Sequence, residues 1–245
     1  MFSKVIGLYG GRARDALAAW LASYNPNPNA LTLLGFFITV LVGVLFALGQ
    51  FLQAGLLLIL TGALDILDGT VARVTRRVTA FGAFFDSAMD RYSDLILFIG
   101  LMIFYARPGP RHSLMTVIVA AVALMGSVMT SYARARAESL IPHCRIGFLE
   151  RPERIVLLII GSLTEAAGAE NSYFLHKMPA VLWVIAVLSH WTVAQRIYHT
   201  WWYLKQMDEA SRRAAESVHV SAWQEHRASA SAASSMWGQV RENKQ

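Results

Sequence analysis

The chain has 245 residues, of which 55% are apolar and 16% are charged, whereas a typical soluble domain has about 25% charged residues. So large an apolar share excludes an intrinsically disordered chain, and a single cysteine, Cys144, excludes a secreted disulfide scaffold. The formal net charge of +6 suits either a nucleic acid or an anionic membrane surface as a partner. The positions of the charges decide between these two classes.

The N-terminal segment has the pattern of a helix that lies on a membrane surface. Residues 12–24 combine basic and polar residues with alanine, leucine and tryptophan, as an amphipathic interfacial helix does. The Asn-Pro-Asn-Pro-Asn run at 25–29 ends this helix and starts the next one, because proline suits the first turn of a helix and asparagine its cap. We therefore predict that residues 1–29 form a juxtamembrane amphipathic helix and linker.

The apolar residues downstream come in blocks. Three blocks contain no Asp, Glu, Lys or Arg over 18 or 19 residues, namely 30–48, 114–132 and 178–195. A helix of that length crosses about 30 Å of hydrocarbon. Three further apolar blocks are shorter and run into charged residues, namely 51–64, 95–106 and 155–164. The sequence therefore predicts an all-α integral membrane protein with six transmembrane helices within residues 30–206.

The basic residues give this bundle an orientation. Six spans put Arg107, Arg111 and Lys177 on one side of the membrane and the other nineteen of the 22 Lys and Arg residues on the opposite side. Basic loops mark the cytoplasmic side, so we expect both termini and the active site to face the cytoplasm, in a multi-pass protein of the inner membrane. The sequence contains no basic–aromatic module for nucleic acid. Residues 207–245, rich in Ala, Ser, Glu and Arg, predict a partly helical, partly disordered cytoplasmic tail.

Five carboxylates lie where lipid would disfavour them. A carboxylate within a span costs roughly 2.5–3.5 kcal/mol unless it meets a partner, a cavity or a metal. Asp65 and Asp68 are spaced i,i+3, so they share one helix face. Asp86, Asp90 and Asp94 are spaced i,i+4,i+8 and share one face of the next helix. If the two helices are antiparallel neighbours, the faces meet. A divalent cation would offset the repulsion, and all-oxygen ligation favours Mg²⁺, Mn²⁺ or Ca²⁺ with a phosphate-bearing substrate.

Two other interpretations fit this spacing. The carboxylates could form structural ion pairs with nearby arginines, namely Arg73, Arg76, Arg77 or Arg91. They could instead be the cation or proton sites of a membrane transporter, which is the usual role of an isolated intramembrane aspartate.

The order of the small and charged residues narrows the choice. From Asp65 to Asp90 the chain reads Asp-x2-Asp-Gly-x2-Ala-Arg-x8-Gly-x3-Asp-x3-Asp. All eight fixed positions match the signature of the CDP-alcohol phosphotransferases, a family that the chain resembles from about Asn25 to Trp202. The resemblance implies six transmembrane helices, a homodimer, and two divalent cations, Mg²⁺ or Mn²⁺, between the helices that carry the signature. It also implies that an alcohol displaces CMP from a CDP-linked lipid.

The resemblance assigns roles to single residues. It implies that the cations are held by Asp65, Asp68, Asp86 and Asp90, and that Asp90 is also the general base that deprotonates the attacking hydroxyl. Small residues let the nucleotide approach the helix backbone, and an arginine neutralises the diphosphate. The implied nucleotide and CDP-lipid site consists of Asn29, Thr32, Asp68, Gly69, Ala72, Arg73 and Gly82.

A second group of residues points to the acceptor alcohol. Several arginines are expected at the membrane depth of the aspartates, which favours an acceptor that itself carries phosphate, although single arginines could simply follow the positive-inside rule. The pattern resembles the phosphatidylinositol-phosphate synthase branch of the family, whose phosphate-binding positions correspond to Ser131, Arg134, Arg154 and Arg196. We therefore predict transfer of a phosphatidyl group from CDP-diacylglycerol to inositol phosphate. Glycerol 3-phosphate, the acceptor of phosphatidylglycerophosphate synthases, is the rival because it needs a cationic site too.

Overall fold

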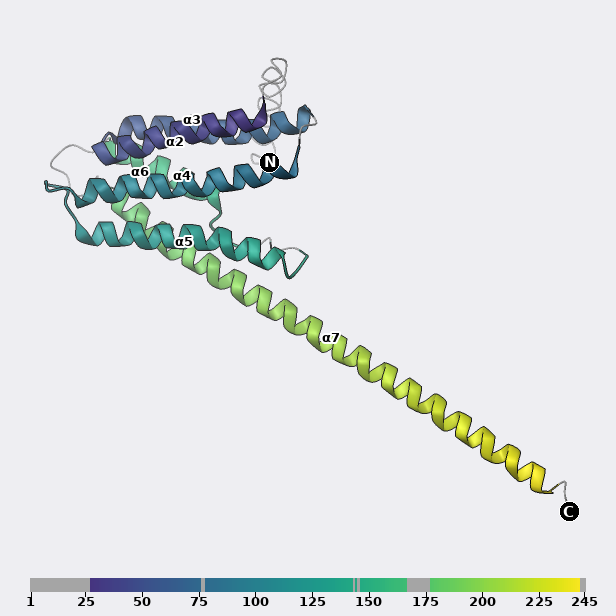
Figure 1. Cartoon of the computed structure of the whole chain (residues 1–245). Helices are drawn as coiled ribbons and strands as arrows, with labels where there is room; N and C mark the ends of the chain where they lie inside the picture. Colours follow the sequence, from purple (N-terminus) through teal and green to yellow (C-terminus); the bar gives the residue numbers. More distant parts are fainter. Residues whose placement is uncertain (1–26, 76–77, 143, 145, 167–176, 243–245) are drawn as a thin grey trace, which may run out of the picture.

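The structure is a computed structural model that describes residues 27–75, 78–142, 144, 146–166 and 177–242. The amphipathic helix predicted at 12–24 lies outside these residues. The described part of the chain is entirely helical and contains no strand. Its helices are, in chain order, α2 (Pro28–Leu48), α3 (Phe51–Val74), α4 (Ala80–Ala106), α5 (Leu114–Glu138), α6 (Arg151–Ala166) and α7 (Met178–Glu242) (Figure 1). The all-α prediction is therefore confirmed for these residues.

The helix ends follow from local sequence. Asn27 caps α2, its side chain accepting a hydrogen bond from the backbone N–H of Asn29 at 3.1 Å, and Pro28 occupies the first turn. At the other end Gly49 adopts φ 78°, the left-handed conformation that glycine tolerates, and its N–H bonds back to α2. α3 therefore begins two residues later and runs back along α2. The predicted Asn-Pro start of the first span is confirmed.

The helices alternate in direction and form a bundle (Figure 1). α2 packs against both α3 and α4, while α5 packs against α4 and α7, and α6 packs against α3 and α7. Backbone contact between α2 and α4 is especially close, because a Cβ added at Gly100 would lie 2.2 Å from the carbonyl oxygen of Gly43. The two carboxylate-bearing helices, α3 and α4, thus lie on either side of α2 instead of packing along each other.

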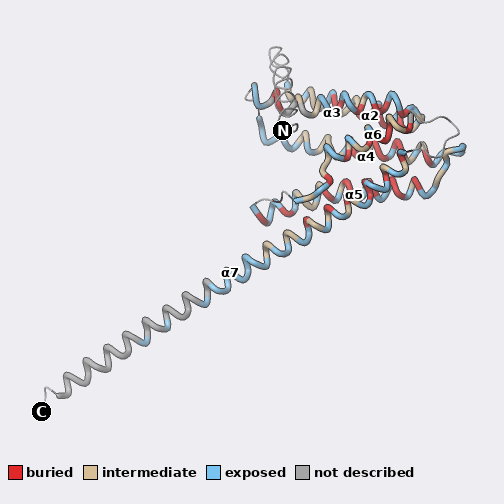
Figure 2. The backbone as a smooth tube through the Cα atoms, turned by 180° about the vertical axis from the view of Figure 1, so that it is seen from behind, coloured by how far each residue is buried: buried red, intermediate tan, exposed pale blue. Residues whose placement is uncertain are grey.

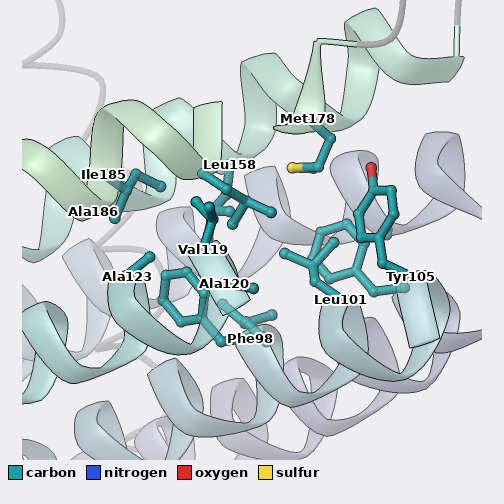
Figure 3. Packing of buried hydrophobic residues seen from close by; sticks show 14 of the residues in the cluster. Phe98, Leu101, Tyr105, Val119, Ala120, Ala123, Leu158, Met178, Ile185 and Ala186 are labelled. Carbon is teal, nitrogen blue, oxygen red and sulfur yellow. The ribbon is translucent and has the colours of Figure 1, made fainter. Parts of the chain in front are cut away.

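The hydrophobic core lies inside the bundle and receives buried side chains from all six described helices. Figure 3 shows Phe98 and Leu101 of α4 beside Val119 and Ala120 of α5, all of them buried. Leu158 of α6 and the α7 residues Met178, Ile185 and Ala186 complete this part of the cluster. Outward-facing apolar side chains are exposed instead, for example Phe37 at 60%. An apolar exterior around an apolar core is what a lipid-surrounded bundle requires.

Three of the helices are long and apolar enough to cross a membrane: Pro28–Leu48, Leu114–Glu138 and Met178–Arg213. They contain the three long blocks predicted from the sequence. The remaining three blocks are helices too, but α3 and α4 carry the aspartates, and the 16 residues of α6 span about 24 Å. Membrane-capable helices are therefore confirmed, and the count of six spans stays a prediction.

The last helix extends far beyond the bundle. α7 is a continuous helix to Glu242, so no break separates residues 207–242 from the apolar part of the helix (Figures 1 and 2). All residues of the stretch 205–213 are exposed. The predicted tail is thus helical wherever the structure describes it.

The two ends of the bundle differ in what they carry. One end has the start of α2, the α3–α4 and α5–α6 connections and the side from which α7 projects (Figure 1). The other end has the remaining connections, to which Arg107, Arg111 and Lys177 belong. Arg111 there forms a 2.9 Å ion pair with the buried Glu165 of α6. The aspartates of the signature lie toward the first end, in the last part of α3 and the first part of α4.

Candidate functional site

Two of the predicted metal ligands converge on a single arginine. The Nη1 atom of Arg151, the first residue of α6, lies 2.7 Å from Asp65 Oδ2 and 2.7 Å from Asp90 Oδ1. Asp65 comes from α3 and Asp90 from α4, so carboxylate oxygens from two helices meet around one point of positive charge. All three side chains are between one fifth and one third exposed, which keeps the cluster accessible.

The other two predicted ligands lie one helical turn away. Asp86 is one turn before Asp90 on α4 and close enough to Asp65 and Asp90 for their charges to interact. Asp68 is one turn after Asp65 on α3, and its side chain lies outside the described residues. The described side chains by themselves form no cluster of three metal ligands. The donor set nevertheless fits a hard divalent cation, because two carboxylates from different helices already converge on one cationic atom and every donor is oxygen.

Asp94 anchors a second, more deeply buried cluster. It is 5% exposed, and its Oδ2 accepts hydrogen bonds from Arg154 Nη2 at 2.8 Å and from Ser127 Oγ at 2.7 Å. Arg154, only 2% exposed, also donates from Nη1 to Thr130 Oγ1 at 3.0 Å. The Nε atom of Arg151 lies 3.9 Å from Asp94 Oδ1, which joins this cluster to the one around Asp90.

A third cluster joins α5, α7 and the loop before α6. Arg196 is 3% exposed, and its guanidinium donates to two backbone carbonyls, Ile146 O at 2.7 Å and Thr130 O at 2.6 Å. Its Nη2 atom also donates to Glu150 Oε1 at 3.1 Å, and Arg134 Nη1 donates to the same oxygen at 3.3 Å. Gly147 lets the loop lie on Arg196, because its φ is 144° and an added Cβ would lie 3.1 Å from Nη2.

The three clusters form one continuous path of polar contacts. The path runs from the aspartate of α4 to the arginines of α5 and α7 in the order Asp90, Arg151, Asp94, Arg154, Thr130, Arg196, Glu150 and Arg134. Three of the four residues predicted to bind the acceptor phosphate belong to it. The fourth, Ser131, is half-buried on α5 directly after Thr130. The structure therefore brings the predicted base and the predicted anion-binding arginines into one polar region.

The residues predicted to bind the nucleotide are less completely described. Asn29 and Gly82 lie together, since a Cβ added at Gly82 would be 3.2 Å from Asn29 Oδ1. Thr32 donates to the carbonyl of Pro28 at 3.3 Å, and the exposed Arg73 donates from Nη2 to Thr70 Oγ1 at 3.1 Å. The side-chain surroundings of Gly69 and Ala72 lie outside the described residues.

Sequence reasoning left several residues of this region without a role. The ion-pair interpretation named Arg73, Arg76, Arg77 and Arg91. Arg76 and Arg77 lie outside the described residues, and the described ion pairs of the aspartates are formed by Arg151 and Arg154. Arg91 instead donates to the carbonyl of Ser87. Arg151 stands three residues before Arg154, the i,i+3 spacing that puts both on one helix face, so the pattern did contain a signal. Nothing in the sequence indicated Glu150 or Thr130.

Comparison with known proteins identifies the class. The described helices form a bundle with three membrane-capable helices and a polar site, and the profile of the CDP-alcohol phosphatidyltransferase family matches residues 26–205. The chain is 40% identical over 177 residues to an archaetidylinositol phosphate synthase of Methanothermobacter thermautotrophicus, covering 71% of this chain and 83% of the relative. It is 34% identical over 194 residues to a phosphatidylinositol phosphate synthase of Mycobacterium marinum, covering 78% and 80%.

Solved structures agree with the sequence relatives. The phosphatidylinositol phosphate synthase of Mycobacterium tuberculosis with CDP-DAG bound is 29% identical, with a TM-score of 0.69 over 78% of this chain and 94% of that one. The same enzyme in complex with manganese and citrate gives a TM-score of 0.67, covering 77% and 88%. The chain therefore belongs to the CDP-alcohol phosphatidyltransferase family and is a transferase. Membership of this family supports the interpretation of the aspartates as part of an enzyme over their interpretation as cation or proton sites of a transporter.

Proposed function

We propose that the protein transfers a phosphatidyl group from CDP-diacylglycerol to inositol phosphate and releases CMP. The observation that carries the proposal is the polar path from Asp90 to Arg196 and Arg134. A base for a hydroxyl and cations for a phosphate at the two ends of one site suit an acceptor that has both groups. One relative is named an archaetidylinositol phosphate synthase and another a phosphatidylinositol phosphate synthase, so both names contain inositol phosphate although the lipid part differs.

Asp90 acts as the general base in this proposal. Its carboxylate takes the proton from an inositol hydroxyl, and the hydroxyl oxygen then forms a bond to the β-phosphorus of CDP-diacylglycerol. The bond between that phosphorus and the bridging oxygen breaks, and CMP leaves with the bridging oxygen. Arg134, Arg154 and Arg196 supply positive charge for the acceptor's own phosphate, with Ser131 as a hydroxyl donor beside them. Because Arg196 is buried and held by two carbonyls, its guanidinium is preorganised for this role.

Two Mg²⁺ ions, or Mn²⁺ in their place, complete the proposed site. Asp65, Asp68, Asp86 and Asp90 would hold them, and when bound they offset the negative charge of the diphosphate. Support comes from the convergence of Asp65 and Asp90 on one cationic atom and from the manganese complex of the mycobacterial relative. Asn29, Thr32, Gly69, Ala72, Arg73 and Gly82, with Asp68, would line the CDP-lipid site.

The membrane setting follows from the same reasoning. The diacyl chains would stay in the bilayer while the head group reaches the aspartates, since these lie toward one end of the bundle. With nineteen of the 22 basic residues expected on that side, we propose an inner-membrane protein whose site faces the cytoplasm. The homodimer implied by the family resemblance is part of the proposal.

The experiment that tests the proposal is a panel of acceptors. The purified protein in detergent is given Mg²⁺ and CDP-diacylglycerol with inositol phosphate, glycerol 3-phosphate, inositol or serine, and CMP release is measured for each. We expect CMP release with inositol phosphate at a higher kcat/KM than with any other acceptor. Preference for glycerol 3-phosphate would overturn the acceptor assignment in favour of phosphatidylglycerophosphate synthesis. Preference for unphosphorylated inositol or serine would also remove the role given to the arginines.

A further inference from the structure

Glu150 is an anion inside the cluster of arginines that we assign to an anionic ligand. A single oxygen, Oε1, accepts hydrogen bonds from Arg196 Nη2 at 3.1 Å and from Arg134 Nη1 at 3.3 Å. The two arginines come from α7 and α5, and Glu150 stands directly before the first residue of α6. One negatively charged oxygen shared by guanidinium groups of two helices is the arrangement in which a phosphate oxygen is bound.

The charges of this cluster are balanced without any ligand. Arg134 is also paired through Nε with Glu138 Oε1 at 3.0 Å, so two carboxylates face the two guanidinium groups of Arg134 and Arg196. A phosphate dianion that takes the same hydrogen bonds would lie in contact with the carboxylate of Glu150. Like charges at contact distance repel strongly in a partly buried site, so the phosphate and the Glu150 carboxylate exclude each other there.

The carboxylate of Glu150 can move away from the two arginines. Its side chain is 41% exposed, and the hydrogen bonds described for its carboxylate are those to the two arginines. Arg196 does not depend on it, because the carbonyls of Ile146 and Thr130 fix its guanidinium independently. Displacing the carboxylate would therefore leave the buried cation in position to bind a new anion.

We propose that Glu150 is an internal competitor for the acceptor's phosphate and thereby sets the affinity for the phosphorylated substrate. The inference rests on the proposed acceptor site. In the unliganded protein the Glu150 carboxylate bridges Arg134 and Arg196, and a phosphate group takes over both hydrogen bonds when it binds. An acceptor without phosphate does not compete for these two hydrogen bonds, so Glu150 lowers the affinity for phosphorylated acceptors alone.

The test measures phosphate binding by charge-removing variants of the full-length protein in lipid nanodiscs. Inorganic phosphate is the minimal probe, its binding followed by ³¹P NMR titration without CDP-lipid, and the KM for inositol phosphate is measured separately. Glu150→Gln should raise the affinity for phosphate about two- to fivefold, the range of an ion pair of this exposure. It should lower the KM for inositol phosphate by a similar factor and leave the KM for CDP-diacylglycerol unchanged. Glu150→Ala should act in the same direction.

Glu138→Gln is the matched control, because Glu138 lies even closer to Arg134 but does not bridge to Arg196. If general removal of negative charge were the cause, this variant would raise phosphate affinity as much as Glu150→Gln, and the inference would be wrong. Unchanged or weaker phosphate binding in Glu150→Gln would overturn it as well, since Glu150 would then be holding the arginines in place. Arg134→Gln tests the proposed site itself. Loss of phosphate binding in that variant supports the site whatever Glu150 does, and unchanged binding removes both proposals.

Discussion

Removing the charge of Asp94 should destabilise the protein strongly, because Asp94 is the counter-charge of a buried arginine. In the Asp94→Asn variant, the Arg154 guanidinium loses the carboxylate that lies 2.8 Å from its Nη2 atom. The side chains of the pair are 2% and 7% exposed, so water cannot replace the lost charge. Arg151, whose Nε is 3.9 Å from Asp94, adds a second positive charge beside the uncompensated one.

The magnitude follows from the burial of the pair. Removing one partner of a buried ion pair costs about 3–5 kcal/mol, because the other partner stays buried and unpaired. Two further hydrogen bonds depend on this arrangement, from Ser127 to Asp94 and from Arg154 to Thr130. The exposed i,i+4 pair of Arg134 and Glu138, with both side chains 40% exposed, is the internal comparison and is worth about 0.3–0.5 kcal/mol.

A double-mutant cycle measures the effect. Unfolding of the wild type, Asp94→Asn, Arg154→Met and the double variant is followed by circular dichroism during denaturant titration in mixed micelles. We expect each single variant to lose about 3–5 kcal/mol and the double variant to lose less than the sum, because no unpaired charge remains in it. Glu138→Gln should change stability by less than 1 kcal/mol. If Asp94→Asn were no more destabilising than Glu138→Gln, the buried pair would not support the fold as argued.

Three further predictions concern the base, the metal and the packing. Asp90→Asn should abolish CMP release while CDP-diacylglycerol binding, measured by calorimetry, persists; full activity would remove Asp90 as the base. Treatment with EDTA should stop transfer, and Mg²⁺ or Mn²⁺ should restore it, whereas activity that survives chelation would contradict the all-oxygen metal site. Gly100→Ala should cost about 1–3 kcal/mol by overpacking, because the new Cβ would meet the Gly43 carbonyl at 2.2 Å. Gly109→Ala, with no atom within 4 Å of the new Cβ, is its control, and equal stability of the two variants would contradict the close α2–α4 contact.

Much of the fold could be predicted because local sequence fixes it. Apolar blocks of 18 or 19 residues have few alternatives to a membrane-capable helix, and Asn27, Pro28 and Gly49 set helix ends through local interactions alone. The signature worked for a similar reason. The i,i+3 and i,i+4 spacings fix a helix face whatever the surroundings are, so the aspartates could be grouped before any neighbour was known.

The arrangement of the helices required the tertiary structure, because contacts between distant residues leave no regular spacing. From the sequence we considered that the two aspartate-bearing helices pack directly against each other. In the structure α2 lies between α3 and α4, and carboxylates of these two helices meet through Arg151 of α6. Asp65 and Arg151 are 86 residues apart in the chain, and no local pattern connects them. The length of α7 was likewise hidden by a change in composition near Met207 that does not break the helix.

The sequence by itself determined an all-helical chain with membrane-capable helices, a family signature and the residue types of a phosphate-handling site. These depend on composition and helical spacing, which are local properties. Only the tertiary structure decided which acidic side chain pairs with which arginine. It pairs Arg154 with Asp94, joins Arg196 to the backbone of Thr130, and sets Glu150 between two arginines. Charge pairing depends on distances across the bundle, and packing alone sets those distances.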